Sequence, residues 1–211
     1  MVKIKICGIT DLESALACVD YGSDAIGFVF AESSRKISKF RCKEIINRLP
    51  PFITTVGLFA NQSKEEVNDI IKLCPLDVLQ FHGDESPEFC LSFNKRIIKA
   101  FRVFSLEDVK RLDNYNVSAY LLDSYDSEKL GGTGKTFDWK LIKGVKNKRI
   151  IVAGGLNPDN VGEAIRECSP YGVDVSSGVE ESSGIKDGIK IKKFIEAVRK
   201  ISPFGRNDKS A

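Results

Sequence analysis

One pattern recurs eight times along the 211 residues of this chain: a short apolar run followed by an amphipathic segment. Short runs rich in β-branched residues predict strands, and amphipathic segments predict helices. Regular alternation of the two is typical of folds built on a parallel sheet. The apolar runs begin near Val2, Ala25, Ile53, Val78, Ile97, Ala119, Ile150 and Gly172.

The number of units decides between two parallel architectures. Residues 25–30 and 150–153 are almost wholly apolar, as expected of strands that are covered on both faces. Eight units favour an α/β single-domain (β/α)8 TIM barrel, whereas an open doubly wound sheet, the alternative, more often has five to seven strands. We expect the barrel domain to span residues 1–201, followed by a polar, frayed C-terminal tail over residues 202–211.

Polar residues at the start of the amphipathic segments predict where helices begin. Ser63 with Glu66, and Ser105 with Asp108, have the spacing of a capping box. The full set of predicted N-caps is Asp11, Ser38, Ser63, Ser86 and Ser105.

Charge and hydropathy limit the partners of the chain. The 32 basic and 29 acidic residues give a net charge of +3, too small and too dispersed to favour nucleic acid or a membrane surface. The sequence has no apolar run of 18 residues and no leader pattern at Met1. We therefore expect a soluble, cytoplasmic protein.

Cysteine usage argues against a metal site. None of the six cysteines forms a C-x-x-C motif, and His82 is the single histidine, so we expect no zinc site. Five of the cysteines fall in or at the end of helix-like segments and are best explained as free buried thiols in a reducing compartment. They are Cys18, Cys42, Cys74, Cys90 and Cys168.

The sixth, Cys7, ends the first predicted strand, where Val2, Ile4 and Ile6 alternate with two lysines. In a barrel of this kind the chemistry lies at the carboxyl ends of the strands. As a base, Cys7 would have to be a thiolate, with its pKa lowered from about 8.5 by positive charge or N–H dipoles. The alternative is a cysteine that only packs.

Asp123 ends the apolar strand predicted over residues 119–123. Desolvation there would raise the pKa of its carboxyl and make it a candidate general acid. The alternative is an aspartate that caps or turns the chain.

Three further polar residues follow predicted strands. Arg35 has the planar fork that matches a carboxylate, although a solvated loop charge is the simpler alternative. Gln80 and His82 alternate with Phe81, so both would face the barrel mouth and bind hydroxyl groups. His82 has two other interpretations: a general base, or a hydrogen-bonded residue at the rim.

The glycine-rich residues 131–139 do not match either of the common nucleotide-binding motifs. Lys129 stands where a P-loop needs glycine, and Phe137 breaks the dinucleotide pattern. A lid over a small substrate, with Gly132 and Gly134 in contact with it, fits better.

Two neighbouring loops predict an anion site. Gly154-Gly155 follows the seventh predicted strand and Ser176-Ser177-Gly178 follows the eighth. Barrels often bind phosphate at this point with the help of a short helix N-terminus. Each motif alone also fits a plain turn.

Seven stretches, read together, resemble the phosphoribosylanthranilate isomerase family over nearly the whole chain. They are KICGIT at 5–10, GFVF at 27–30, QFHG at 80–83, LLD at 121–123, GGTGKTFDW at 131–139, AGGLNPDNV at 153–161 and DVSSGVE at 174–180. The resemblance implies a (β/α)8 barrel of tryptophan biosynthesis that rearranges N-(5-phosphoribosyl)anthranilate, a small phosphorylated sugar derivative, without metal or other cofactor.

The resemblance also implies residue roles. The general base falls on Cys7 and the general acid on Asp123, while Arg35 meets the anthranilate carboxylate. Phosphate falls on Gly154-Gly155 and on Ser176-Ser177-Gly178, and Asp174 contacts a hydroxyl group. The family resemblance leaves a monomer and a homodimer open.

Other functions remain as alternatives. A pentose-phosphate epimerase would need metal-ligating histidines, whereas this chain has only His82. An indole-glycerol-phosphate synthase would need catalytic lysines at strand ends, which we do not find. A non-catalytic phosphate-binding barrel would keep the glycine and serine loops without needing Cys7 and Asp123. The joint presence of these two residues favours an enzyme.

Overall fold

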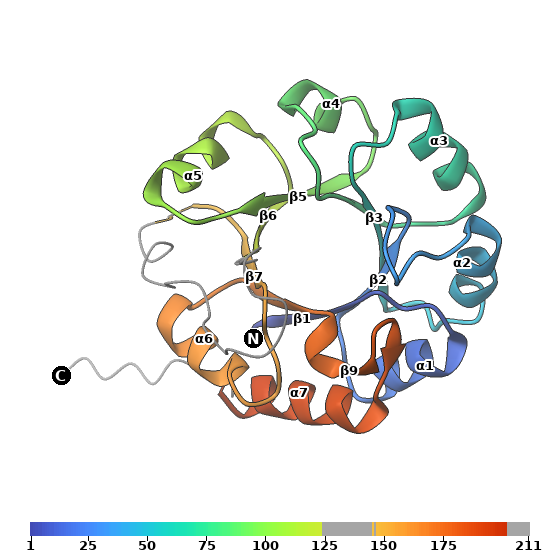
Figure 1. Ribbon diagram of the computed structural model, residues 1–211, viewed down its shortest axis with the longest axis vertical. Coiled ribbons are helices and arrows are strands. Elements are labelled where there is room, and N and C mark those ends of the chain that lie inside the picture. The colour runs from blue at the N-terminus through green and yellow to red at the C-terminus, as the bar shows by residue number, and fades with distance from the viewer. Residues whose placement is uncertain (124–144, 146, 202–211) are drawn as a thin grey trace.

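The computed structural model describes residues 1–123, 145 and 147–201, and eight parallel strands within them close into one barrel in the order β1 to β8. Figure 1 shows the helices arranged as a ring outside the strands. The predicted (β/α)8 barrel is therefore confirmed. The glycine-rich residues 131–139, with Gly132 and Gly134, and the tail at 202–211 lie outside the described residues.

The strands begin within one residue of their predicted starts. They are β1 (Lys3–Cys7), β2 (Ala25–Val29), β3 (Thr54–Phe59), β4 (Val78–Phe81), β5 (Arg96–Arg102), β6 (Ala119–Asp123), β7 (Ile150–Ala153) and β8 (Gly172–Val175). The barrel closes where β1 pairs with β8, with Lys5 opposite Asp174 in the register.

All five predicted N-caps accept a hydrogen bond from the first turn of a helix, and both predicted capping boxes form. The helices are α1 (Leu12–Asp20), α2 (Lys39–Ile46), α3 (Lys64–Leu73), α4 (Pro87–Leu91), α5 (Leu106–Lys110), α6 (Val161–Cys168) and α7 (Gly188–Ile201), with a short 3-10 helix, η1 (Arg111–Asn114), after α5.

The segment after β8 differs from a simple strand–helix unit. A 3-10 turn, η3 (Ser177–Val179), leads into an antiparallel pair, β9 (Glu180–Ser182) and β10 (Ile185–Lys186), before α7 begins. Strands of two and three residues are too short to produce a periodic signal in the sequence. This hairpin places the charged side chains of Glu180 and Lys186 close to Arg35.

The alternation in β1 divides its side chains between two environments. Ile4 and Ile6 are fully buried in the outer core between the barrel and the helices. Their neighbours Lys3, Lys5 and Cys7 lie on the other face of the strand, toward the barrel interior. The inner core is built of small and medium apolar residues, among them Val56, Ala100, Ala119 and Ala153. The polar face of β1 is therefore the inner one.

The six cysteines are free thiols, and Cys18, Cys42, Cys74 and Cys90 are buried as expected, while Cys168 is half-buried. Within the described residues, no helix combines the length and the apolarity needed to cross a bilayer.

Candidate active site

A cavity of about 380 Å³ lies at the carboxyl ends of the strands and gathers most of the predicted site residues. These residues come from the strands β1, β6 and β8 and from the loops that follow β2, β4, β7 and β8. The predicted residues that line it are Cys7, Arg35, His82, Asp123, Gly154, Gly155, Asp174, Ser176 and Ser177. The topology thus brings together residues that are up to 170 positions apart, which is what closure of the barrel achieves.

Cys7 ends β1 and is 4% exposed. Burial raises the pKa of its thiol above the ordinary value, and the positive charges of Lys5 and Lys186 act against that rise while Asp174 adds to it. These surroundings alone therefore do not supply the lowered pKa that a thiolate base requires, because burial outweighs the two lysines.

Asp123 ends β6 and is held by His82. His82 Nε2 lies 3.2 Å from Asp123 Oδ2, and the Gln80 side-chain nitrogen lies 3.1 Å from His82 Nδ1. If Nδ1 accepts from the Gln80 amide, the ring proton is on Nε2, which then donates to Asp123. His82 therefore fixes the orientation of the Asp123 carboxyl.

Gln80 does not occupy the position expected of it. Its side chain is fully buried, and its oxygen Oε1 has no hydrogen-bond partner within the described residues. Because Gln80 precedes His82 by two residues on the same face of the chain, it lies one layer deeper in the barrel. It supports His82 there and is absent from the lining of the cavity.

Arg35 is engaged by a residue that the sequence analysis did not single out. Its Nε and Nη2 each donate to Glu180, both at 2.7 Å, and Lys186 Nζ donates to the same carboxylate at 2.8 Å. Although burial opposes ionisation of Glu180, these hydrogen bonds and charges lower its pKa to about 2. The fork of Arg35 thus faces a buried carboxylate of the β9–β10 hairpin.

The two loops expected to bind phosphate lie side by side. Gly154 and Gly155 both have positive φ, at 85° and 63°. The first N–H groups of η3, those of Ser177 and Gly178, have no acceptor within that turn. A Cβ on Gly178 would lie 1.9 Å from the carbonyl oxygen of Leu156, so the loops pack tightly only because residue 178 is glycine. Gly178 therefore joins the two loops and does not itself line the cavity.

The comparisons with known proteins agree with this geometry. A sequence model of the family described as N-(5'-phosphoribosyl)anthranilate (PRA) isomerase matches residues 4–197. The chain belongs to the N-(5'-phosphoribosyl)anthranilate isomerase family. A relative of that name from Pelobacter propionicus is 49% identical over 201 residues, which cover 94% of this chain and 96% of the relative.

Solved structures of this isomerase family superpose closely on the fold. The enzyme from Thermotoga maritima has a TM-score of 0.90 and 43% identity, covering 95% of this chain and 100% of its own. A second structure, with a TM-score of 0.86 and 41% identity over the same shares, is a phosphoribosylanthranilate isomerase in complex with reduced 1-(o-carboxyphenylamino)-1-deoxyribulose 5-phosphate. The chain is a PRA isomerase of tryptophan biosynthesis.

Four charged residues that line the cavity or contact its lining residues were not predicted from the sequence. Lys5 shares a strand face with Cys7, a signal that the alternation already contained. Glu180 and Lys186 carry no local signal, since their relation to Arg35 depends on the hairpin. Arg102, at the end of β5, also lines the cavity, although its surroundings in the sequence are uninformative.

Proposed function

We propose that Cys7 is the general base and Asp123 the general acid in the conversion of N-(5'-phosphoribosyl)anthranilate to 1-(2-carboxyphenylamino)-1-deoxyribulose 5-phosphate. One observation carries this assignment: the two side chains line a single cavity from the ends of β1 and β6. The loops after β7 and β8 line the same cavity, so a phosphate held there would place the sugar between the two groups.

The residue types define the proton transfers. Asp123 donates a proton to the ring oxygen of the ribose as the bond from that oxygen to C1′ breaks, and the anthranilate nitrogen stabilises the resulting Schiff base. The Cys7 thiolate then removes the proton from C2′, which gives an enolamine that tautomerises to the ketone. These transfers leave a proton on Cys7 and a charge on Asp123, and exchange with solvent restores both.

The two ends of the substrate would be held by different groups. The phosphate accepts from backbone N–H groups of the Gly154-Gly155 and Ser176-Ser177 segments, as is common near a short helix start in barrels. Asp174 accepts from a sugar hydroxyl group. The anthranilate carboxylate pairs with Arg35, whose Nη1 makes no hydrogen bond to the described residues. The product analogue bound by a relative contains both anionic groups.

A fluorescence assay tests the two catalytic assignments. Loss of anthranilate-type fluorescence reports turnover, and we expect C7A and D123N each to lower kcat by a factor of about 10² to 10⁴, the usual contribution of an acid or a base. Far-UV circular dichroism checks that both variants remain folded. C168A and D113N are matched controls outside the cavity and should keep full activity. Undiminished turnover in C7A or D123N would refute the role given to that residue.

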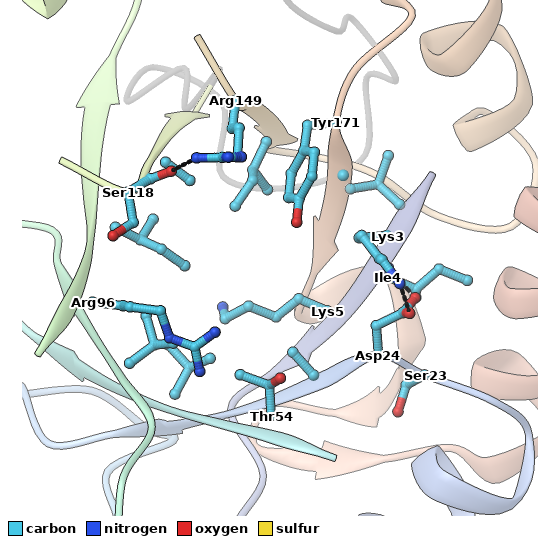
Figure 2. A pocket seen from close by; sticks show the side chains of 18 of the residues that line it. Lys3, Ile4, Lys5, Ser23, Asp24, Thr54, Arg96, Ser118, Arg149 and Tyr171 are labelled. Atoms are coloured by element: carbon cyan, nitrogen blue, oxygen red, sulfur yellow. Dashed lines mark hydrogen bonds and ion pairs between the residues drawn. The ribbon is translucent and has the colours of Figure 1, made fainter. Parts of the chain in front are cut away.

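We also propose that the chain acts as a homodimer through the amino ends of its strands. Phe52, between α2 and β3, is 98% exposed and lies at a second cavity, of about 600 Å³, at that end of the barrel. Figure 2 shows Arg96, Arg149 and Tyr171 around this cavity. A large exposed phenylalanine beside a cavity is typical of a surface that a partner covers. A solved structure of monomers generated from the Thermotoga maritima enzyme, 40% identical to this chain with a TM-score of 0.86, describes that enzyme as dimeric.

Two further expectations belong to the same proposal. Residues 1–201 form a single catalytic domain, and the chain works in the cytoplasm on a small phosphorylated substrate. The net charge of +3 supports a protein without a nucleic-acid partner.

A further inference from the structure

A buried ion pair that the proton transfers above do not use lies directly beneath the cavity. Lys5 Nζ is 2.9 Å from Asp174 Oδ1, and both side chains are almost fully buried. Lys5 and Asp174 are opposite each other in the β1–β8 register, where the barrel closes. Figure 2 shows Lys5 extending from its strand across the inside of the barrel. Asp174 lines the substrate cavity, so the pair connects the barrel interior to the site.

The same ammonium group lies in the neighbourhood of the Cys7 sulfur. Lys5 and Cys7 are two residues apart in β1 and therefore share a face. The position of Gly27 on the neighbouring strand β2 shows how close they are. A Cβ at residue 27 would lie 2.9 Å from Cys7 Sγ and 3.2 Å from both Cε and Nζ of Lys5. The sulfur and the ammonium thus both lie over Gly27, which leaves room for both because it has no side chain.

The charges around Cys7 act in opposite directions. Burial raises the pKa of Cys7, Lys5 lowers it through its charge and a hydrogen bond, and Asp174 raises it again. Lys186 on β10 also lowers it, and Arg35, which interacts with the Cys7 charge, is itself paired with Glu180 on β9. Asp174 is therefore the carboxylate that competes directly with Cys7 for the Lys5 ammonium.

We propose that Lys5 is a positioning residue that holds the Cys7 sulfur as a thiolate, and that substrate strengthens this hold by engaging Asp174. Without substrate, Asp174 occupies the ammonium, and burial favours the protonated thiol. A sugar hydroxyl that donates to Asp174 partly neutralises its charge, and the ammonium is then free to stabilise the sulfur anion. The thiol proton leaves to solvent. This inference rests on the assignment of Cys7 as the base.

The pH dependence of Cys7 alkylation tests the coupling without any turnover. Iodoacetamide reacts with the thiolate, and mass spectrometry of the Cys7 peptide separates this site from the other five cysteines. We expect K5M to slow alkylation about tenfold at a fixed pH and to move its midpoint upward by about one unit. We expect D174N to move the midpoint downward. An unchanged midpoint in K5M, or an upward shift in D174N, would overturn the proposal.

Two variants separate this effect from general damage. Lys3 lies on the same face of β1, two residues further from Cys7, and is paired with Asp24. K3M should therefore leave the midpoint unchanged. The double variant K5M/D174N leaves neither buried charge unpaired, and its midpoint should lie above that of D174N alone. Equal midpoints in the double variant and D174N would show that Lys5 does not act on the sulfur.

The effect of substrate appears in the two pH profiles of the enzyme. In the pH profile of kcat/KM, the acid limb reports the pKa of the base in the free protein. In the pH profile of kcat, it reports the pKa of the base in the substrate complex. We expect the limb of kcat to lie at lower pH, and the separation to disappear in D174N. Coincident limbs in the unmodified protein would contradict the substrate effect. If C7A retains activity while alkylation still depends on Lys5, the base assignment fails and the Lys5–Cys7 coupling stands.

Discussion

Three ion pairs are buried within the described part of this protein. Lys5 pairs with Asp174, Lys99 with Glu85, and Lys186 with Glu180, and all six side chains are nearly inaccessible to solvent. An unpaired charge in such a place would cost several kcal/mol. The Lys5–Asp174 pair lies near Cys7, and the Lys186–Glu180 pair lies near Arg35. An anionic substrate would change the electrostatic potential at both residues when it binds.

Replacement of Arg35 tests its role at the anthranilate end. We expect R35A to raise KM about tenfold or more and to lower kcat less, because a charge-assisted hydrogen bond to a carboxylate is worth roughly 1.5–3 kcal/mol. Steady-state kinetics measures both constants. R41A removes an arginine that pairs on the exposed surface of α2 with Glu44 and should change neither. An unchanged KM in R35A would exclude the carboxylate contact.

Glu180 makes the stability of the fold sensitive to acid. Its pKa is about 2 in the folded protein against about 4.5 ordinarily, so its ionised form stabilises the native state above pH 4.5. That contribution is lost as the pH falls toward 2. The free energy of unfolding of the unmodified protein should exceed that of E180Q at pH 7, and the difference should shrink below pH 4.5. If the difference in unfolding free energy did not depend on pH, ionisation of Glu180 would not be the source of the stabilisation.

At the scale of elements, the site depends on how the loops after β7 and β8 pack. The carbonyl of Leu156 in one loop lies where a side chain at position 178 of the other would begin. Backbone cannot move aside as a flexible side chain does. The width of the proposed phosphate site is therefore set by a residue that does not line the cavity.

The variant G178A should separate these two loops. We expect KM for substrate to rise and the free energy of unfolding to fall by about 1–3 kcal/mol, the usual cost of overpacking. Kinetics and urea denaturation measure the two effects. G188A is the control, because a Cβ at Gly188 would meet nothing within 4 Å. Normal KM and stability in G178A would show that the loops adjust freely.

The elements that could be predicted from the sequence are those with a local signal. Eight strand starts and five N-caps follow from apolar runs and capping side chains within a few residues of each other. The β9–β10 hairpin could not be predicted because its strands are only two and three residues long. The pairing of Arg35 with Glu180 could not be predicted because it joins residues 145 positions apart. For the same reason the burial of Cys7, which raises the pKa of its thiol, was not foreseen.

At the scale of the whole molecule, the barrel has a different surface at each end. The carboxyl end holds Cys7, Asp123 and the two loops that we propose bind phosphate, whereas the amino end holds the larger cavity and the exposed Phe52. The Lys5–Asp174 pair lies between them, because Lys5 lines one cavity and Asp174 the other. We therefore propose that catalysis takes place at the carboxyl end of the barrel and dimer formation at its amino end.

The variant F52E tests association separately from catalysis. We expect light scattering with size-exclusion chromatography to show a dimer for the unmodified protein and a monomer for F52E, because a carboxylate would be buried at the contact. Activity per chain should stay close to normal. F40E changes an exposed phenylalanine on α2 and should remain dimeric. A monomeric unmodified protein at micromolar concentration would contradict the proposal.

The central claim, that one substrate lies between Cys7 and Asp123, is tested most directly by a crystal structure with the reduced product analogue. The account predicts a single bound molecule with its phosphate on the N–H groups of Gly155 and Ser177. Its sugar carbons should lie within hydrogen-bonding reach of both the Cys7 sulfur and the Asp123 carboxyl, about 3–4 Å. A ligand whose sugar contacts only one of these two groups, or whose phosphate lies elsewhere in the barrel, would contradict it.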